Sequence, residues 1–147
     1  MNRRSILKAA GAMAIALITL PRMAFAAYAE KAFKNKEVDS SLNELFGSNA
    51  TTPSDEVKLK APDIAENGAV VPVEVSTSLN ADSIAIMIKE NPNPLAIVAD
   101  IPPGTEGKLK TRVRMGKTTL VTAVVNSGGK LYTASKEVKV TIGGCGG

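Results

Sequence analysis

Hydrophobic and polar residues alternate along most of the chain after residue 56, and this alternation is typical of half-buried β-strands. Val71, Val73 and Val75, for example, alternate with Glu74 and Ser76. Because successive side chains of a strand point to opposite faces, one set is expected in a core and the other in solvent. The same period is found in Val57/Leu59, Ile84/Ile86/Ile88, Leu95/Ile97/Ala99/Ile101, Leu109/Val113/Met115 and Val138/Val140/Ile142.

One run, residues 120–125 (LVTAVV), is apolar on both faces and predicts a central strand. Turn-forming residues separate the runs, and these are Asn67-Gly68, Asn91-Pro92-Asn93-Pro94, Pro102-Pro103-Gly104 and Ser127-Gly128-Gly129. About seven short strands with this spacing favour an all-β fold, an immunoglobulin-like antiparallel β-sandwich. The lack of tryptophan and of a cysteine pair excludes an antibody-like domain in detail.

The segment before the strands is predicted to be helical from residue 28 to residue 46, with a restart at SSLNELFG. Ser41 followed by Glu44 fits a capping box, in which the two side chains satisfy amides at the start of a helix. Gly47 stands where a left-handed C-terminal cap is expected. Residues 48–55 (SNATTPSD) are a loop by composition.

The first 29 residues have the order of zones found in an export signal. Arg3-Arg4 precede an apolar stretch at residues 9–20, and small residues then offer cleavage after Ala26 or Ala29. The arginine pair resembles a twin-arginine signal, which predicts a periplasmic protein. A membrane anchor is disfavoured, because twelve apolar residues in a helix span about 18 Å, against a hydrocarbon core of roughly 30 Å.

Removal of the signal changes what the charge implies. The signal holds four basic residues and no acidic one, so the mature chain has fourteen of each and a net charge of zero. The basic whole-chain balance therefore gives no reason to expect nucleic-acid or membrane partners. We divide the chain into a removed signal peptide (1–26), a helical segment and loop (27–55), a β-sandwich (56–142) and a C-terminal arm (143–147).

The chain contains no histidine, and this removes the usual general base and the commonest metal ligand. The carboxylates are scattered over outward strand positions and loops. Met87 and Met115 fall within strand patterns and are interpreted as packing residues rather than metal ligands. We therefore expect no catalytic residue, no metal site and no bound cofactor, and thus a protein that is not itself an enzyme.

Cys145 is the single cysteine of the chain, and it lies in the terminal sequence GGCGG. Glycine visits nearly all backbone conformations, so Gly143, Gly144, Gly146 and Gly147 predict a flexible arm around a bare thiol. Such an arm can enter a narrow pocket of another protein, which is what a covalent carrier needs.

Two other hypotheses fit a lone exported thiol. An exported structural or adhesive sandwich module would use Cys145 for an intersubunit disulfide. A thiol oxidoreductase is disfavoured, because the sequence has neither a C-x-x-C motif nor a resolving cysteine.

The sequence resembles the SoxY family of bacterial thiosulfate oxidation. The likeness is carried by the GGCGG tail and extends through PDIAENGAVVPVEV (62–75), KENPNPLA (89–96), TRVRMGKT (111–118) and residues 129–147. The resemblance implies that Cys145 is the attachment point of thiosulfate-derived sulfur, first as an S-thiosulfonate and then as a persulfide. It also implies a heterodimer with SoxZ and transient docking to the haem-containing SoxAX, the hydrolase SoxB and a sulfur dehydrogenase.

Overall fold

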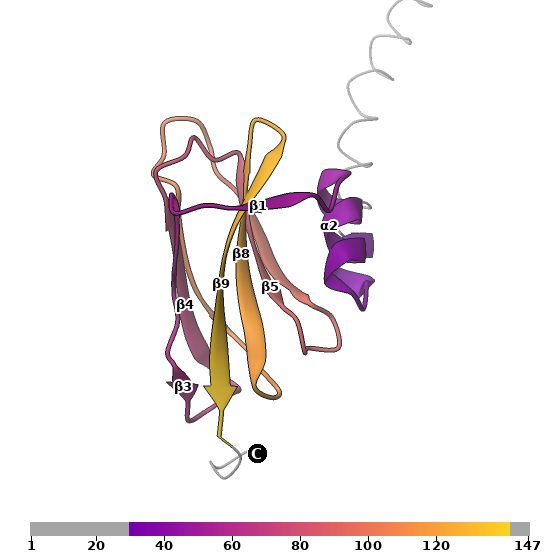
Figure 1. Cartoon of the computed structure of the whole chain (residues 1–147), viewed down its shortest axis with the longest axis vertical. Helices are drawn as coiled ribbons and strands as arrows, with labels where there is room; N and C mark the ends of the chain where they lie inside the picture. Colours follow the sequence, from indigo (N-terminus) through magenta and orange to yellow (C-terminus); the bar gives the residue numbers. More distant parts are fainter. Residues whose placement is uncertain (1–29, 142–147) are drawn as a thin grey trace, which may run out of the picture.

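The computed structural model describes residues 30–141, and within that range two β-sheets pack face to face. A helix covers the outer face of the larger sheet, so the layers are helix, larger sheet and smaller sheet (Figure 1). The predicted immunoglobulin-like sandwich is confirmed.

The larger sheet has the order β1 (Thr51–Pro53), β9 (Lys130–Val140), β8 (Thr119–Ser127), β5 (Ser83–Ile88) and β6 (Leu95–Asp100), with β3 (Ile64–Ala65) also paired to β9. The smaller sheet has the order β2 (Val57–Lys60), β4 (Val71–Thr77) and β7 (Lys108–Val113). The helix is α2 (Val38–Phe46), and residues 30–34 are also helical. Among these strands, β1 and β3 each pair with β9 in parallel, and all the other pairings are antiparallel.

The core between the sheets is built from the alternating positions of β4 and β5. Val71, Val73 and Val75 are at most 1% exposed, and Ile84, Ile86 and Ile88 are fully buried. Burying each such side chain stabilises the fold by about 1.5–3 kcal/mol. The inward-facing valines and isoleucines of these two strands therefore hold the two sheets together.

Strand β5, and β8 at residues 123–125, are buried on both faces, because α2 covers the side of the sheet that faces away from the core. Every residue of β5 is buried, and Ala85 and Met87 pack with Leu42 of α2. Strand β8 lies between β9 and β5, so the prediction of a central strand at residues 120–125 is confirmed. The packing role expected for Met87 and Met115 is also confirmed, since each is 1% exposed.

Strand β6 does not follow the alternation from residue 95 onward. The register passes from Ile86↔Ile97 to Met87↔Leu95, which leaves Ala96 as an extra residue. Such a bulge reverses the facing of the side chains that follow it. Ile97 thus packs against the core between the sheets, whereas Leu95 packs beneath α2. The prediction that both side chains share one face was wrong.

Helix α2 starts earlier than the sequence pattern indicates. Its N-cap is Glu37 rather than Ser41, so the predicted capping box was wrong. Ser41 is fully buried, and its hydroxyl donates to the carbonyl oxygen of Ala32 at 3.1 Å. The C-terminal cap is confirmed, because Gly47 has a φ of 73° and its N–H donates to the carbonyl of Asn43 at 2.8 Å.

Residues 48–55 were expected to form a loop, but Thr51–Pro53 form β1 beside β9. Such a strand shows no burial alternation, since all three residues are exposed. The turn between β8 and β9 is confirmed. Gly128 and Gly129 have φ of 59° and 84°, the left-handed pair that a two-residue hairpin needs.

Candidate functional site

Cys145 and its four flanking glycines lie outside the described residues, so the predicted arm itself is not part of the geometry below. The structure describes the place from which that arm departs, which is the end of β9 at residues 139–141. This end lies at the C-terminal tip of the sandwich, beside β3 (Figure 1). We call it the arm root.

The arm root is hydrogen-bonded on both sides. Strand β3 runs parallel to it, and the N–H groups of Lys139 and Thr141 donate to the carbonyls of Asp63 and Ala65 at 3.0 and 3.2 Å. On the other side, the N–H of Val140 donates to the hydroxyl of Thr118 at 3.1 Å. The chain therefore leaves the sandwich from a position fixed by both neighbours.

An ion pair reinforces the contact between β9 and the segment before β3. The ammonium of Lys136 lies 2.9 Å from the carboxylate of Asp63 and donates to the carbonyl of Ala61 at 2.6 Å. The hydrogen bond from Lys136 is the main reason why the pKa of Asp63 is lowered from its ordinary value. Because the Asp63 side chain is 89% exposed, the pair orients this segment more than it stabilises the fold.

Three loops meet at the arm root. The N–H of Met115, after β7, donates to the carbonyl of Gly68, before β4, at 2.7 Å. The side-chain amide of Asn91, after β5, donates to the carbonyl of Arg114 at 2.7 Å. A Cβ placed on Gly68 would lie 3.0 Å from Val140, so this loop packs directly against β9. The three loops thus form the surface from which the chain continues toward Cys145.

The Asn67-Gly68 turn is confirmed, but Gly68 is needed for a different reason than the left-handed conformation that turns usually require. The φ angle of Gly68 is not positive, so its backbone conformation does not require glycine. Its α-carbon instead lies so close to the carbonyl of Met115 that a side chain would not fit. The side-chain oxygen of Asn67 accepts the N–H of Ala69 at 3.0 Å and closes the turn.

Two large apolar side chains are exposed near the arm root. Ile64 of β3 is 55% exposed, and Val70, between Gly68 and β4, is 51% exposed. Sequence reasoning did not select them, nor Thr118 and Asp63, because such positions lie in short strands and loops where no periodicity marks them. Lys136 lies in the long strand β9, but its partner Asp63 is distant in the sequence. Single exposed apolar residues are ordinary, but these two lie close to the arm root.

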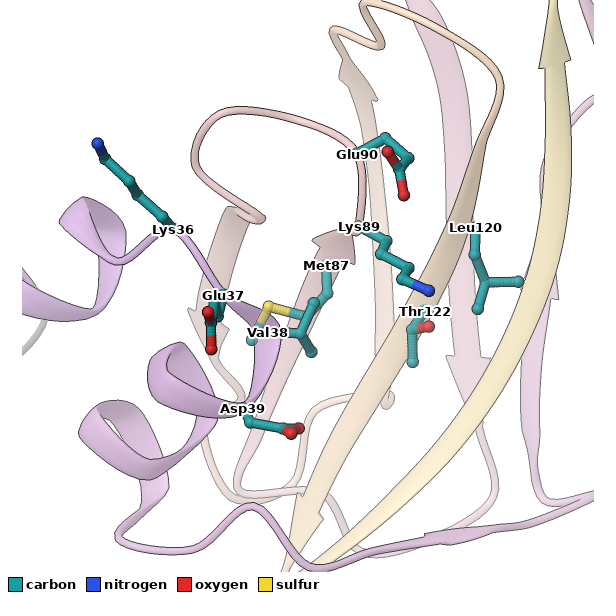
Figure 2. Close-up of a pocket in the computed structure, with 9 residues that line it drawn as sticks. All are labelled: Lys36, Glu37, Val38, Asp39, Met87, Lys89, Glu90, Leu120 and Thr122. Carbon is teal, nitrogen blue, oxygen red and sulfur yellow. The ribbon is translucent and has the colours of Figure 1, made fainter.

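A cavity of about 410 Å³ lies elsewhere, between α2 and the outer face of the larger sheet (Figure 2). Acidic and basic side chains line it together, among them Glu37, Asp39 and Lys89, with Met87 and Thr122 on the sheet side. Within residues 30–141 no group of three metal-ligating side chains comes together, and no helix is long and apolar enough to cross a membrane.

Fold and site together define a small immunoglobulin-like sandwich whose described part presents an anchored chain end rather than a reaction centre. A family model described as "Sulfur oxidation protein SoxY" matches residues 42–145, which is most of the chain and includes Cys145. The chain belongs to the SoxY family, and the resemblance seen in the sequence is confirmed. Membership places it among the proteins of sulfur oxidation, with a carrier role.

One solved structure agrees with this assignment, and a second shows the same fold. The sulfur carrier protein SoxY from Chlorobium limicola f thiosulfatophilum is 43% identical, with a TM-score of 0.66, and the match covers 72% of this chain and 97% of that one. A superoxide reductase (neelaredoxin) from Ignicoccus hospitalis shares the fold at 16% identity and a TM-score of 0.55, covering 62% of this chain and 94% of its own. The comparison with curated proteins gave no match.

Proposed function

We propose that this protein is a periplasmic carrier that holds sulfur intermediates covalently on Cys145 and presents them to partner enzymes during thiosulfate oxidation. The observation that carries the proposal is the family match, which extends through the single cysteine of the chain. The described residues add an anchored root from which the arm departs.

The proposed chemistry starts from the Cys145 thiolate and thiosulfate. A new S–S bond forms between the cysteine sulfur and the outer sulfur of thiosulfate, and the haem protein SoxAX takes up the two electrons. SoxB then hydrolyses the terminal S–S bond of the S-thiosulfonate with one water, releasing sulfate and two protons and leaving an ionised persulfide on Cys145. The remaining sulfur is then either oxidised by a sulfur dehydrogenase, which passes the electrons to its own acceptor, or moved to storage elsewhere. The carrier needs no cofactor of its own in this series of reactions.

The arm root limits how an enzyme can reach the sulfur. Cys145 follows Thr141 by four residues, so their α-carbons lie at most about 14 Å apart. Because Thr141 is held to Ala65 of β3, any pocket that receives Cys145 must bring its rim close to this end of the sandwich. The exposed side chains of Ile64 and Val70 are therefore proposed to contact that rim.

The partner assignment within the proposal is a stable heterodimer with SoxZ and transient complexes with SoxAX, SoxB and a sulfur dehydrogenase. The proposed cellular location is the periplasm, to which the twin-arginine-type signal at residues 1–26 would export the protein. Family membership supports partners of the sulfur-oxidising system in general.

The decisive experiment is mass spectrometry of the native C-terminal peptide from cells grown on thiosulfate. We expect S-thiosulfonate or sulfane adducts on Cys145 that a reductant removes, and we expect Cys145→Ser to abolish whole-cell thiosulfate oxidation with fold and pairing intact. A bare thiol in the native peptide, or oxidation that survives the substitution, would refute the carrier role. A disulfide dimer as the dominant species on a non-reducing gel would instead support the structural module.

A further inference from the structure

The outer face of the smaller sheet carries a concentration of positive charge. The registers of β2, β4 and β7 place its outward residues in three rows, which are Lys58–Ser76–Lys108, Lys60–Glu74–Lys110 and Pro72–Arg112. All five cationic side chains belong to exposed residues. We call this surface the basic face.

The charge of the basic face is not balanced locally. Residues 30–141 contain fourteen basic and fourteen acidic side chains, and the basic face holds five of the former but only one of the latter, Glu74. The rest of the described chain therefore carries an excess of acids. Glu56 and Glu106 lie in the turns at the far end of the sheet, and the row that contains Arg112 lies nearest the arm root.

Glu74 is already engaged and does not neutralise its neighbours. Its carboxylate lies 3.4 Å from the ammonium of Lys108, 3.9 Å from that of Lys110 and 4.0 Å from that of Lys60. Its hydrogen bond with Lys108 is the main reason why the pKa of Glu74 is lowered, so the group remains ionised near neutral pH. Lys60 and Lys110 are still 77% and 76% exposed and are available to an external anion.

A shallow hollow of about 290 Å³ lies on the same face, between Lys60 and Lys110. Pro62 and Pro72 line it, so apolar surface is flanked by two cations. Pro62 directly precedes the segment in which Asp63 bonds to β9, which makes the hollow adjacent to the arm root. Apolar surface beside cations is what an acidic protein surface with a protruding apolar side chain complements, whereas a small inorganic anion needs only the cations.

We propose that the basic face is a docking surface for an acidic protein surface, namely that of an enzyme that acts on the arm. This inference rests on the proposed carrier function and adds to it the charge of the partner surface. Oppositely charged surfaces accelerate encounter and orient the two proteins before close contact forms. With the arm root at the edge of the basic face, this orientation would bring Cys145 toward the enzyme's pocket.

Edge lysines also have a structural use, because charges on edge strands discourage sheets from pairing with one another. Lys58 and Lys60 of β2 and the cations of β7 occupy such edges. That use predicts no effect of these charges on enzyme binding. Edge protection and enzyme docking therefore differ in the effect that removing these charges has on the affinity for the enzyme.

The test measures binding of the full mature chain to purified SoxAX by surface plasmon resonance, at about 20 mM and about 200 mM NaCl, since this range shortens the screening length markedly. The variant is Lys58→Gln/Lys110→Gln/Arg112→Gln, which leaves Lys108 paired with Glu74. The control, Lys31→Gln/Lys36→Gln/Lys130→Gln, removes the same charge from exposed or half-exposed positions outside the basic face. Each chain is also made with Cys145→Ser, so that binding is read without chemistry.

We expect wild-type binding to weaken about tenfold with salt, and the variant to bind about tenfold more weakly at low salt with little further loss. The control should behave as the wild type. Equal losses in variant and control, or binding that salt does not affect, would overturn the basic face as a docking site. Binding to anionic phospholipid vesicles, lost in the variant while SoxAX binding is unchanged, would overturn the acidic protein as its occupant.

The two proposals fail separately in this design. Salt-dependent and variant-sensitive binding without any adduct on Cys145 would refute the carrier function and retain the docking surface. Adduct formation on Cys145, together with binding that neither salt nor the variant changes, would retain the carrier function and refute the docking surface.

Discussion

Replacing Gly68 by alanine should destabilise the sandwich at the arm root. A Cβ at this position would lie 2.3 Å from the carbonyl oxygen of Met115 and 3.0 Å from Val140. The first neighbour is backbone, so relief requires the two loops to separate by about 1 Å in a closely packed region. The same movement weakens the 2.7 Å hydrogen bond from the Met115 N–H to the Gly68 carbonyl.

The expected magnitude follows from these contributions. Overpacking of this kind costs about 1–3 kcal/mol, and weakening one buried backbone hydrogen bond adds about 1 kcal/mol. Replacing glycine restricts the unfolded chain and returns about 0.4–1 kcal/mol. The net loss in the free energy of unfolding is therefore about 1–3.5 kcal/mol.

Gly116→Ala is the matched control, because Gly116 lies next to Met115, has no positive φ, and has no atom within 4 Å of the position that a Cβ would occupy. The substitution has the same effect on the unfolded chain without the clash, so the stability of this variant should equal or slightly exceed that of the wild type. Urea unfolding of both variants, monitored by circular dichroism, measures the difference. Equal midpoints for the two variants would refute the close-approach explanation for Gly68.

Two further predictions concern the site and its surroundings. Glu74→Gln should lower the free energy of unfolding relative to the wild type above about pH 4.5, because the lysines stabilise the carboxylate form of Glu74 in the folded state. This difference should shrink as the pH falls through the lowered pKa of Glu74 in the folded state. Urea titrations at several pH values test this, and a difference that does not change with pH contradicts it. Ile64→Glu should lower kcat/KM for enzymatic loading of Cys145 about tenfold, as expected when an apolar contact at an interface becomes a desolvated charge. Leu120→Glu, at a 40% exposed position on the same outer face but two strands along from β3, on β8, should not, and equal effects of the two would argue against contact at the arm root.

The strands that join the two sheets could be predicted because their burial repeats every second residue. Strand β4 is the clearest case, with valines inside and Glu74 outside. Strands β1 and β3 could not be predicted in this way, since they are two or three residues long and are defined by parallel pairing with a distant strand. Leu95 was misplaced because a bulge is a property of two paired strands and leaves no mark in one of them.

The candidate site divides in the same manner. Cys145 was selected as a candidate because it is the single cysteine of the sequence, and this is a compositional signal. The side chains around the arm root carry no such signal, because Asp63 and Lys136 are 73 residues apart and become partners only when β3 pairs with β9. Ser41 illustrates the opposite case, where a strong local motif was overruled by burial against Ala32.

The anchoring of β9 has a consequence for how the proposed reaction sequence proceeds in time. An enzyme that covers this end of the sandwich while it holds Cys145 leaves no approach for another. Consecutive steps on one sulfur atom then require complete dissociation in between, so the slowest release would limit overall turnover. A large excess of one enzyme should accordingly inhibit the step that follows it.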